Sequence, residues 1–513
     1  MKQPQMDTGV TDSITLPAIP DALGGETAMT SQGRRGASWP THKTKLVCTI
    51  GPASRFRPVM EQMILAGMNV ARLNFSHGDF SGHREVIENL RAAEHSTGRR
   101  IAIMADLPGP KMRIGNLKQE AVDLKTGSVF VLTDRDIIGD ETCVSTTFPR
   151  LAQAVKPGNA LYINDGLIQL EVSSVVGNDV HCRVIVGGEL RSRKGLNLPD
   201  IDLGISAFTE HDYDCLKFSL ESGVDAVSQS FVEKPEDILA VRQAAADLGY
   251  HPFVIAKIER SRALTSIDKI IDAADGVMIA RGDLGVEMPI EQMAIIQKRV
   301  MRLANMRAKP VITATQMLES MTTNRRPTRA EATDVANAIL DGTDCVMLSG
   351  ESAVGAYPVE AVATLARIAA ATEPFRENFG PKEMFRGIDL KDKVPAAKLI
   401  DLAVERVLEY ASNAFVFVPA HNGAAVRSIA RFRLPVWIIA VGFQEATCRH
   451  LQFSSGVFAT YEPEAPQEWS AYSRRWLQDR GLSADLAVLA HEHSQLDSEA
   501  VYRMEIIDLR GKS

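Results

Sequence analysis

The sequence lacks the marks of several protein classes. Its six cysteines never occur as C-x-x-C, so neither a zinc site nor a disulfide framework is indicated. It has no apolar run of the ~18 residues needed to span a membrane, and no apolar signal segment near its N-terminus. Basic residues are not in excess, since 57 Lys and Arg face 64 Asp and Glu. The net charge of −7 argues against general nucleic-acid binding. We therefore expect a cytoplasmic protein with no membrane and no nucleic-acid partner.

Length and composition indicate a globular protein of several domains. The chain has 513 residues, more than the roughly 250–300 that one hydrophobic core usually serves. Residues 1–42 are rich in Gly, Ser, Thr, Pro and Gln and show no periodic apolar pattern, so we expect a disordered extension there.

The stretch Phe253–Glu287 indicates strand, helix, strand. Apolar runs cover Val254–Ile258 and Gly276–Ala280, and Arg262–Ala273 between them has apolar residues near helical spacing. Apolar runs that alternate with helices are typical of a parallel sheet buried on both faces. Active sites of such folds lie at the carboxyl ends of the strands.

That rule brings Lys257, Glu259 and Asp283 to one edge. Carboxylates on neighbouring strands suit Mg²⁺, which takes one or two of them plus substrate phosphate oxygens. Lys257 lies two residues before Glu259, on the same face of its strand, and could stabilise a developing anion. The alternative is a buried salt bridge that ends two strands.

The same rhythm recurs along most of the chain and predicts an α/β fold with a (β/α)8 TIM barrel. The eight expected strands are Lys45–Ile50, Asn69–Leu73, Ile101–Ala105, Asp225–Ser230, Val254–Ile258, Gly276–Ala280, Pro310–Ala314 and Cys345–Leu348. We expect the barrel in residues 43–113 and 206–380.

Residues 114–205 break this rhythm with short strands and turns but no helix, which predicts an inserted all-β lid domain. Its expected strands are Ser128–Thr133, Ala160–Ile163, Leu167–Val175 and Val180–Val186. After a charged linker to about Lys393, helices and strands indicate a C-terminal open α/β domain, residues 381–513. Its expected elements are Ala396–Ala411, Ala414–Val418, Ala424–Phe432, Val436–Val441, Leu486–Ala490 and Met504–Leu509.

Each expected barrel strand ends in polar side chains. They are Thr49, Ser54, Arg72, Asn74, Ser76, His77, Asp106, Arg113, Ser230, Lys257, Glu259, Asp283, Thr315, Ser349 and Glu351. Several cations around two carboxylates match what phosphoryl transfer needs, because that reaction depends on positioning and charge neutralisation. Gly282 and Asp283 also open a predicted helix, whose free N–H groups can hold an anion.

Several motifs resemble pyruvate kinase, in the same order, from about Lys43 to Ala370. They are VCTIGPAS (47–54), MNVARLNFSHG (68–78), ADLPGPKMRIG (105–115), KGLNLP (194–199), AKIE (256–259), ARGDLGVE (280–287), ATQMLESM (314–321), RPTRAEATDVANAILDGTDCVMLSGESA (326–353) and YPVEAV (357–362). The resemblance implies transfer of a phosphoryl group from phosphoenolpyruvate to ADP, giving pyruvate and ATP, in a homotetramer.

The resemblance also implies roles for single residues. Glu259 and Asp283 would bind Mg²⁺ or Mn²⁺, and Lys257 would stabilise the transferring phosphoryl group and the enolate. Arg72 and Arg113 would hold phosphate, while Ser230, Gly282, Asp283 and Thr315 would line the substrate site. Ser349 and Glu351 would relay a proton through water, and Thr49, His77 and Lys194 would contact the nucleotide, Lys194 from the lid.

Two departures from the family pattern suggest hypotheses. Family members that need K⁺ bind it with residues matching Asn74, Ser76 and Asp106, but here Leu107 and Lys111 replace a Thr and an acidic residue. We expect that K⁺ is not required because the Lys111 ammonium takes its place; the alternative is an exposed lysine without a role. In addition, Pro419–Ala424 lacks the hydroxyls of the family's sugar-phosphate loop, so we expect no usual activation by fructose bisphosphate. Arg427 remains, and we expect it on a solvated helix face.

Two other functions remain open. A phosphoenolpyruvate-related barrel lyase or aldolase would also place a Glu and an Asp on Mg²⁺, but it would not need a nucleotide lid carrying Lys194. A non-catalytic regulatory paralogue would be expected to have lost Lys257, Glu259, Asp283 or Thr315, and all four are present.

Overall fold

The computed structural model describes residues 39–376, 395–411, 413–494 and 500–510. Among them, no helix combines the length and apolar character that crossing a bilayer requires.

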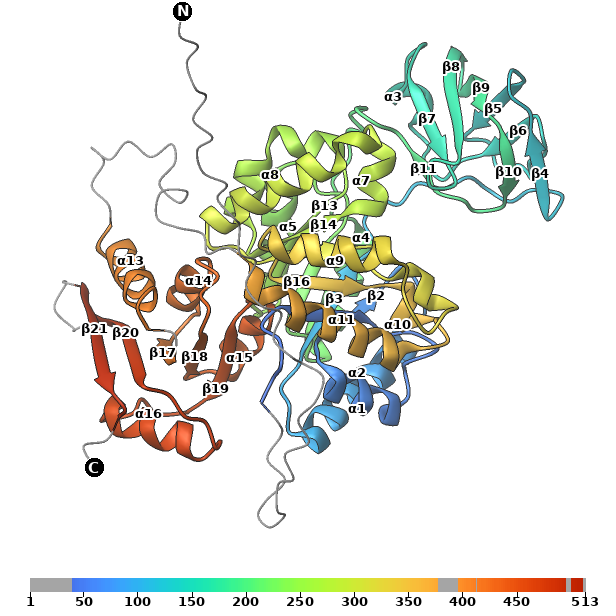
Figure 1. Cartoon of the computed structure of the whole chain (residues 1–513). Helices are drawn as coiled ribbons and strands as arrows, with labels where there is room; N and C mark the ends of the chain where they lie inside the picture. Colours follow the sequence, from blue (N-terminus) through green and yellow to red (C-terminus); the bar gives the residue numbers. More distant parts are fainter. Residues whose placement is uncertain (1–38, 377–394, 412, 495–499, 511–513) are drawn as a thin grey trace, which may run out of the picture. The chain divides into compact units, whose positions relative to one another are not determined.

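Eight parallel strands close into a barrel, as predicted (Figure 1). Around the barrel the order is β1 (Lys45–Thr49), β16 (Cys345–Leu348), β15 (Val311–Ala314), β14 (Gly276–Ala280), β13 (Phe253–Ile258), β12 (Ala226–Gln229), β3 (Ala102–Leu107) and β2 (Met68–Asn74). In the register of β13 and β14, Ile258 pairs with Ile279. The residues that follow these two strands therefore leave the barrel side by side.

The alternation of strand residues explains which side chains reach the site. On β13, Val254, Ala256 and Ile258 join the apolar core beneath the helices. Phe253 and Ile255 belong instead to a second core cluster, formed by residues from all eight strands. Because side chains alternate along a strand, Lys257 continues the row of Phe253 and Ile255.

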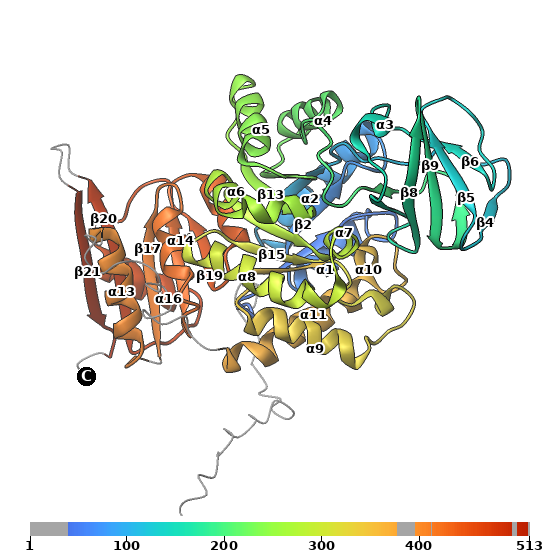
Figure 2. The ribbon, with the colours of Figure 1, turned by 90° about the horizontal axis from the view of Figure 1, so that it is seen from above.

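Helices surround the strands (Figure 2). They are α1 (Arg57–Ala66), α2 (Phe80–Thr97), α4 (Glu210–Glu221), α5 (Pro235–Asp247), α6 (Ile267–Ala273), α7 (Arg281–Glu287), α8 (Met293–Met306), α9 (Arg329–Leu340), α10 (Gly350–Ala353) and α11 (Pro358–Thr372). The expected helix Arg262–Ala273 is wrong in its first part, where Ser261–Thr265 forms a separate 3₁₀ turn. Ser261 and Arg262 there bind carboxylates of the chain leaving the lid.

The inserted lid contains two sheets. One has the order β11 (Leu196–Asn197), β7 (Ala160–Ile163), β8 (Ile168–Val176), β9 (Asp179–Val186), β5 (Val129–Thr133), β6 (Cys143–Ser145), and the other pairs β10 (Gly188–Arg191) with β4 (Ala121–Leu124). A short helix, α3 (Leu151–Ala154), corrects the expectation of an insertion without helices. The lid has a hydrophobic core of its own, which includes Phe130 and Leu170.

The C-terminal domain is an open sheet with the order β19 (Val457–Tyr461), β18 (Trp437–Gly442), β17 (Ala414–Ala420), β20 (Leu486–Ser494), β21 (Ala500–Asp508). Helices α13 (Ala396–Leu408) and α14 (Ala424–Ala430) cover one face, and α16 (Trp469–Gln478) covers the other (Figure 1). β19, α15 (Glu445–His450) and α16 were not expected from the sequence, because they lie in a stretch of mixed polarity.

Two expectations outside the barrel, those for Trp39–His42 and for Arg427, need correction. Residues 1–38 and 377–394, the expected extension and linker, lie outside the described residues. Trp39–His42 were expected to be disordered, but Trp39 stacks on Phe458 with ring centroids 4.8 Å apart, and His42 is buried. Arg427 does not lie on a solvated face, since its guanidinium lies 5.8 Å from the ring centroid of Phe253 and burial lowers its pKa.

Candidate active site

Lys257 is the centre of a buried cluster at the carboxyl ends of the barrel strands. Its ammonium donates to the Ser230 hydroxyl at 2.6 Å and lies 2.7 Å from Oε1 of Glu259 and 3.2 Å from Oδ1 of Asp106. Burial alone would lower the pKa of Lys257, but the charges of Asp106 and Glu259 raise it above its ordinary value. Lys257 is therefore a fixed, desolvated cation held between one hydroxyl and two carboxylates.

Asp106 joins the cations of this cluster. Arg72 donates to its Oδ2 from Nε at 2.9 Å, and Ser228 donates to its Oδ1 at 2.7 Å. Burial favours the neutral acid, but Lys257 and Arg72 outweigh it, so the pKa of Asp106 lies below its ordinary value. One buried carboxylate thus holds two cations.

Arg72 also connects this cluster to the first strand of the barrel. Its Nη1 donates to the Thr49 hydroxyl at 2.9 Å, and that hydroxyl donates to the carbonyl of Leu348 at 2.9 Å. The guanidinium is held from two sides while 11% of its side chain stays exposed. Such an arginine is preorganised to bind an anion that enters from the mouth of the barrel.

Glu259 and Asp283 form a carboxylate pair that fits a divalent cation. Burial raises the pKa of Glu259, and the nearby charges of Asp283 and Asp106 add to the increase against the opposing effect of Lys257. Glu259 accepts from the backbone N–H of Phe231 at 2.9 Å. Within the described ranges, no cluster of three or more typical metal-ligating side chains occurs. Two carboxylates suffice for Mg²⁺, since water and substrate oxygens complete its shell.

Thr315 directly follows β15 and has a strained backbone conformation. Thr315 and Gln316 have φ of +69° and +53°, a left-handed conformation that is unfavourable for a β-branched residue. Arg281 stabilises it by donating to the carbonyls of Ala314 and Thr315. The Thr315 hydroxyl accepts from the N–H of Gly282 at 2.8 Å. The N–H that was expected to bind substrate is therefore occupied by Thr315.

Ser349 and Glu351 follow β16 and contact each other through the backbone. The N–H of Ser349 donates to Oε2 of Glu351 at 2.8 Å, and the N–H of Leu318 donates to Oε1 at 3.0 Å. The Glu351 side chain is buried, whereas Ser349 is half-buried. The pair thus connects the ends of the last barrel strands.

The remaining predicted residues form a basic rim around His77. Burial lowers the pKa of His77, and the charges of Lys111, Arg113 and Arg72 lower it further. Lys111 is exposed and has no ion pair among the described residues, and the partners of Asp106 are Arg72, Lys257 and Ser228. Asn74 accepts from the N–H of Ser76.

Lys194 lies in the lid beside Arg193, between β10 and β11. Arg113 donates to the carbonyl of Arg193 at 2.9 Å, and the N–H of Ile114 donates to the carbonyl of Lys194. The backbone of this part of the lid is therefore bound to the segment that enters the lid.

Sequence reasoning missed several residues that hold the site. Ser228, Phe231 and Arg281 contact Asp106, Glu259 and Thr315, respectively. Ser228 had a signal, because it lies two residues before Ser230 and shares its face of the strand. Phe231 acts through its backbone, so its side-chain type carried no signal.

Comparisons with known proteins agree with this geometry. The family model "Pyruvate kinase, barrel domain" matches residues 41–362. A pyruvate kinase of Thermococcus litoralis is 48% identical over 82% of this chain and 88% of its own length. A pyruvate kinase of Geobacillus stearothermophilus is 43% identical over 83% of this chain and 72% of its own length.

Solved structures agree as well. The crystal structure of a pyruvate kinase from Cryptosporidium parvum superposes with a TM-score of 0.84 at 30% identity, covering 91% of this chain and 96% of that one. With a family model over more than half of the chain and relatives this similar, the chain belongs to the pyruvate kinase family of phosphotransferases.

Proposed function

We propose that this chain transfers the phosphoryl group of phosphoenolpyruvate to ADP, giving pyruvate and ATP. The observation that carries the proposal is the Lys257 ammonium, which lies between Asp106, Ser230 and Glu259 at the mouth of the barrel. Arg72 lies on the other side of Asp106. One buried and one partly exposed cation on the same carboxylate supply the charge that a transferring phosphoryl group requires.

Glu259 and Asp283 would hold the divalent cation, Mg²⁺ or Mn²⁺. The pair fits because burial, with the nearby charge of Asp283, raises the pKa of Glu259, and a bound divalent cation would favour the charged form of both carboxylates. When bound, the cation would neutralise negative charge on the phosphoryl oxygens.

The residues of the chain act in two stages. In the first, an oxygen of the ADP terminal phosphate forms a bond to phosphorus as the bond from phosphorus to the enol oxygen breaks. Arg72 and Arg113 orient the phosphate, and Lys257 stabilises the charge that develops on the enol oxygen. Thr49, His77 and Lys194 bind the nucleotide, and the lid excludes water, which would otherwise accept the phosphoryl group.

In the second stage, the enolate left after transfer takes a proton at carbon. Thr315 lies beside Gly282 at the rim of the site, and Ser349 with Glu351 lies at the end of β16. We assign to these three residues the delivery of that proton through water. Ketonisation then makes the transfer nearly irreversible.

The test is the initial rate of pyruvate formation from phosphoenolpyruvate, ADP and Mg²⁺. We expect Lys257→Met to lose at least about 1,000-fold in rate, because removal of one preorganised charge stabiliser typically has an effect of this order. Lys217→Met on α4 is a matched control outside the cluster and should keep the wild-type rate. A wild-type protein without any activity would contradict the proposed function.

We also propose that the reaction does not require K⁺. Asp106 is already neutralised by Arg72 and Lys257, and Lys111 places a further positive charge near His77. In a buffer free of K⁺ and NH₄⁺ we expect the full rate, and we expect Lys111→Glu to lose most of it. An unchanged rate for this variant would refute the role of Lys111, and dependence of the wild type on KCl would refute K⁺ independence.

Two further proposals concern regulation and assembly. The turn at 421–423, which follows β17, offers no hydroxyl side chain, so fructose bisphosphate is not expected to bind there in the family's usual way. Saturable binding in a calorimetric titration would overturn this. The family also favours a homotetramer, which sedimentation equilibrium would test.

A further inference from the structure

Arg260, directly after Glu259, is the largest fully buried side chain in the described part of the chain. Its Nε donates to Oε1 of Glu233 at 3.1 Å, and its Nη1 forms an ion pair with Oε1 of Glu287 at 3.2 Å. Its Nη2 donates to the carbonyls of Leu198 and Ile201, each at 3.2 Å. One guanidinium therefore joins three other segments of the chain.

Each of the first two segments also carries a group of the candidate metal site. Glu287 is four residues after Asp283, at the other end of α7. Glu233 lies two residues after Phe231, whose N–H binds Glu259. Through these contacts, Arg260 holds together the backbone that supplies both carboxylates and a hydrogen-bond donor to one of them.

The third segment is the chain that leaves the lid, residues 198–204, which we call the return segment. Its apolar residues Leu198, Ile201 and Leu203 pack in the core of the lid. Its backbone carbonyls bind Arg260 of the barrel instead. The return segment has no regular secondary structure, and these two hydrogen bonds attach its backbone to the barrel.

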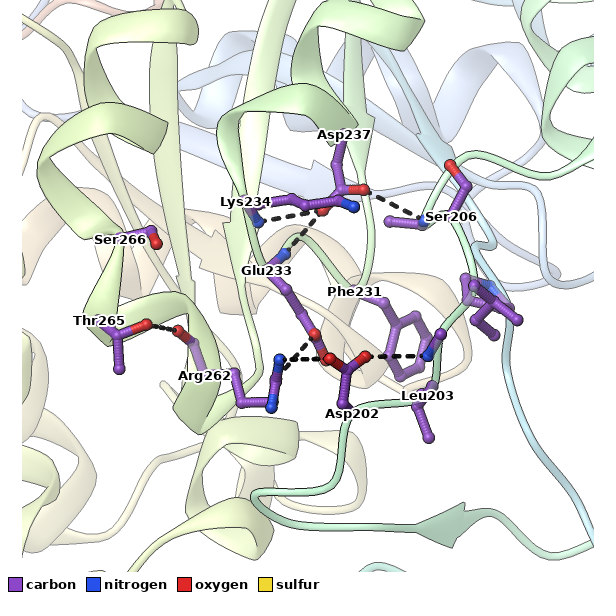
Figure 3. Close-up of a pocket in the computed structure, with 14 residues that line it drawn as sticks. Asp202, Leu203, Ser206, Phe231, Glu233, Lys234, Asp237, Arg262, Thr265 and Ser266 are labelled. Atoms are coloured by element: carbon purple, nitrogen blue, oxygen red, sulfur yellow. Dashed lines mark hydrogen bonds and ion pairs between the residues drawn. The ribbon is translucent and has the colours of Figure 1, made fainter. Parts of the chain in front are cut away.

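The two residues after Arg260 add contacts nearer the surface. Ser261 donates to Asp200 at 2.7 Å, and Arg262 lies between Glu233 and Asp202, as Figure 3 shows. A cavity of about 490 Å³ borders residues 202–207 there. The return segment is therefore not tightly packed where it borders the cavity. Its buried contact with the barrel is the one with Arg260.

We propose that Arg260 is a positioning residue that couples the position of the lid to the geometry of the Glu259 and Asp283 carboxylates. The inference rests on the proposed function, because it concerns the metal site of that reaction. A movement of the lid would displace the return-segment carbonyls that bind the Arg260 guanidinium. Because Arg260 follows Glu259 directly in sequence, this displacement would change the position of the Glu259 carboxylate. Groups that orient metal ligands typically change affinity by 10–100-fold when they are removed.

The test uses Mn²⁺ alone, titrated against the full chain without substrate and followed by electron paramagnetic resonance. The main variant is the pair Arg260→Met with Glu287→Gln, because removal of the arginine alone would leave the buried Glu287 without its cation. Arg260→Lys keeps the charge but cannot reach all of the acceptors. Arg262→Gln is the matched control, since this arginine also contacts Glu233 but is 36% exposed.

In the double variant we expect Mn²⁺ affinity to fall at least tenfold and amide hydrogen exchange in residues 198–204 to rise at least tenfold. Arg260→Lys should give an Mn²⁺ affinity and an exchange rate between those of the double variant and the wild type. Arg262→Gln should stay within twofold of the wild type in both measurements. If the double variant does not fold, Arg260→Lys decides, with a three- to tenfold loss expected.

Three results would overturn the inference. One is wild-type Mn²⁺ affinity in a folded double variant, or in Arg260→Lys where that variant decides. Another is a loss of Mn²⁺ affinity in Arg262→Gln equal to that of the double variant. This would mean that the loss of any contact with the return segment lowers the affinity and that Arg260 has no special role. A wild-type protein that binds no Mn²⁺ would overturn the proposed metal site together with this inference, whereas binding by the wild type with unchanged variants would overturn the inference alone.

Discussion

Replacing Asp106 by Asn should shift the alkaline limit of activity to lower pH. In the wild type, Asp106 lies 3.2 Å from the Lys257 ammonium and, with Glu259, raises the pKa of that lysine against the effect of burial. The interaction between Asp106 and Lys257 contributes its full stability below the ordinary pKa of lysine. This contribution is lost only as the pH rises through the higher pKa that Lys257 has in the folded protein. The isosteric amide removes one of the two compensating charges.

The size of the shift follows from Coulomb's law. At 3.2 Å and an effective dielectric constant of about 20, the attraction is about 5 kcal/mol, which sets an upper limit of about 4 pH units on the displacement of the alkaline limb. Relaxation and water reduce this value, so we expect the alkaline limb of the rate profile to move down by about 1–3 pH units. Breaking a buried pair should also destabilise the fold by about 3–5 kcal/mol.

The assay is the rate of pyruvate formation between pH 6 and 12, a window that includes the wild-type alkaline limb, together with unfolding in urea to correct for the unfolded fraction. Ser228→Ala is the control, because it removes a hydrogen bond to Asp106 but no charge. It should move the alkaline limb by less than about half a unit, given the modest net worth of a hydrogen bond. A folded Asp106→Asn protein with the wild-type alkaline limb would refute the reasoning.

Three further predictions concern stability. Burial raises the pKa of Glu287 to about 7, so its contribution is present below about pH 4.5 and decreases by up to about 3 kcal/mol as the pH rises through 7. Urea unfolding at pH 5 and 8 should show this decrease, and Glu287→Gln should abolish it. Burial lowers the pKa of Lys45 to about 8, so stability should rise by up to about 3 kcal/mol between pH 8 and 10.5. Lys45→Met should lack this rise in the same measurement; its persistence would contradict the assignment. Trp39→Ala should destabilise the protein by about 2–3 kcal/mol, because a half-buried indole leaves the ring of Phe458; an unchanged melting temperature would show that this contact contributes nothing.

The barrel could be predicted from the sequence because its evidence is local. The strands are four to seven residues long, most of them mainly apolar, with polar side chains at their ends, and the observed bounds agree with the expected ones to within a few residues. The lid was predicted from the loss of this rhythm, but strands of two or three residues, such as β11 and β6, are too short to show alternation.

The polar cluster could be predicted only in part. Lys257, Glu259 and Asp283 were identified from their places at strand ends, and the structure brings Asp106 and Arg72 to the same cluster. The central role of Asp106 was not visible, because its contact with Lys257 spans 151 residues of sequence. Its place between Lys257 and Arg72 depends on the order in which β2, β3, β12 and β13 lie around the barrel.

By itself, the sequence determined the eight-stranded barrel, the inserted lid and the residues that face the mouth of the barrel. These follow from apolar runs that alternate with helical patterns and from the rule that parallel strands end at one edge. Only the tertiary structure decided which charges meet. The sequence does not distinguish a charged residue that lies on the surface, such as Lys111, from one that is fully buried, such as Arg260. What separates the two cases is whether distant segments supply carboxylates and carbonyls that offset the loss of solvation.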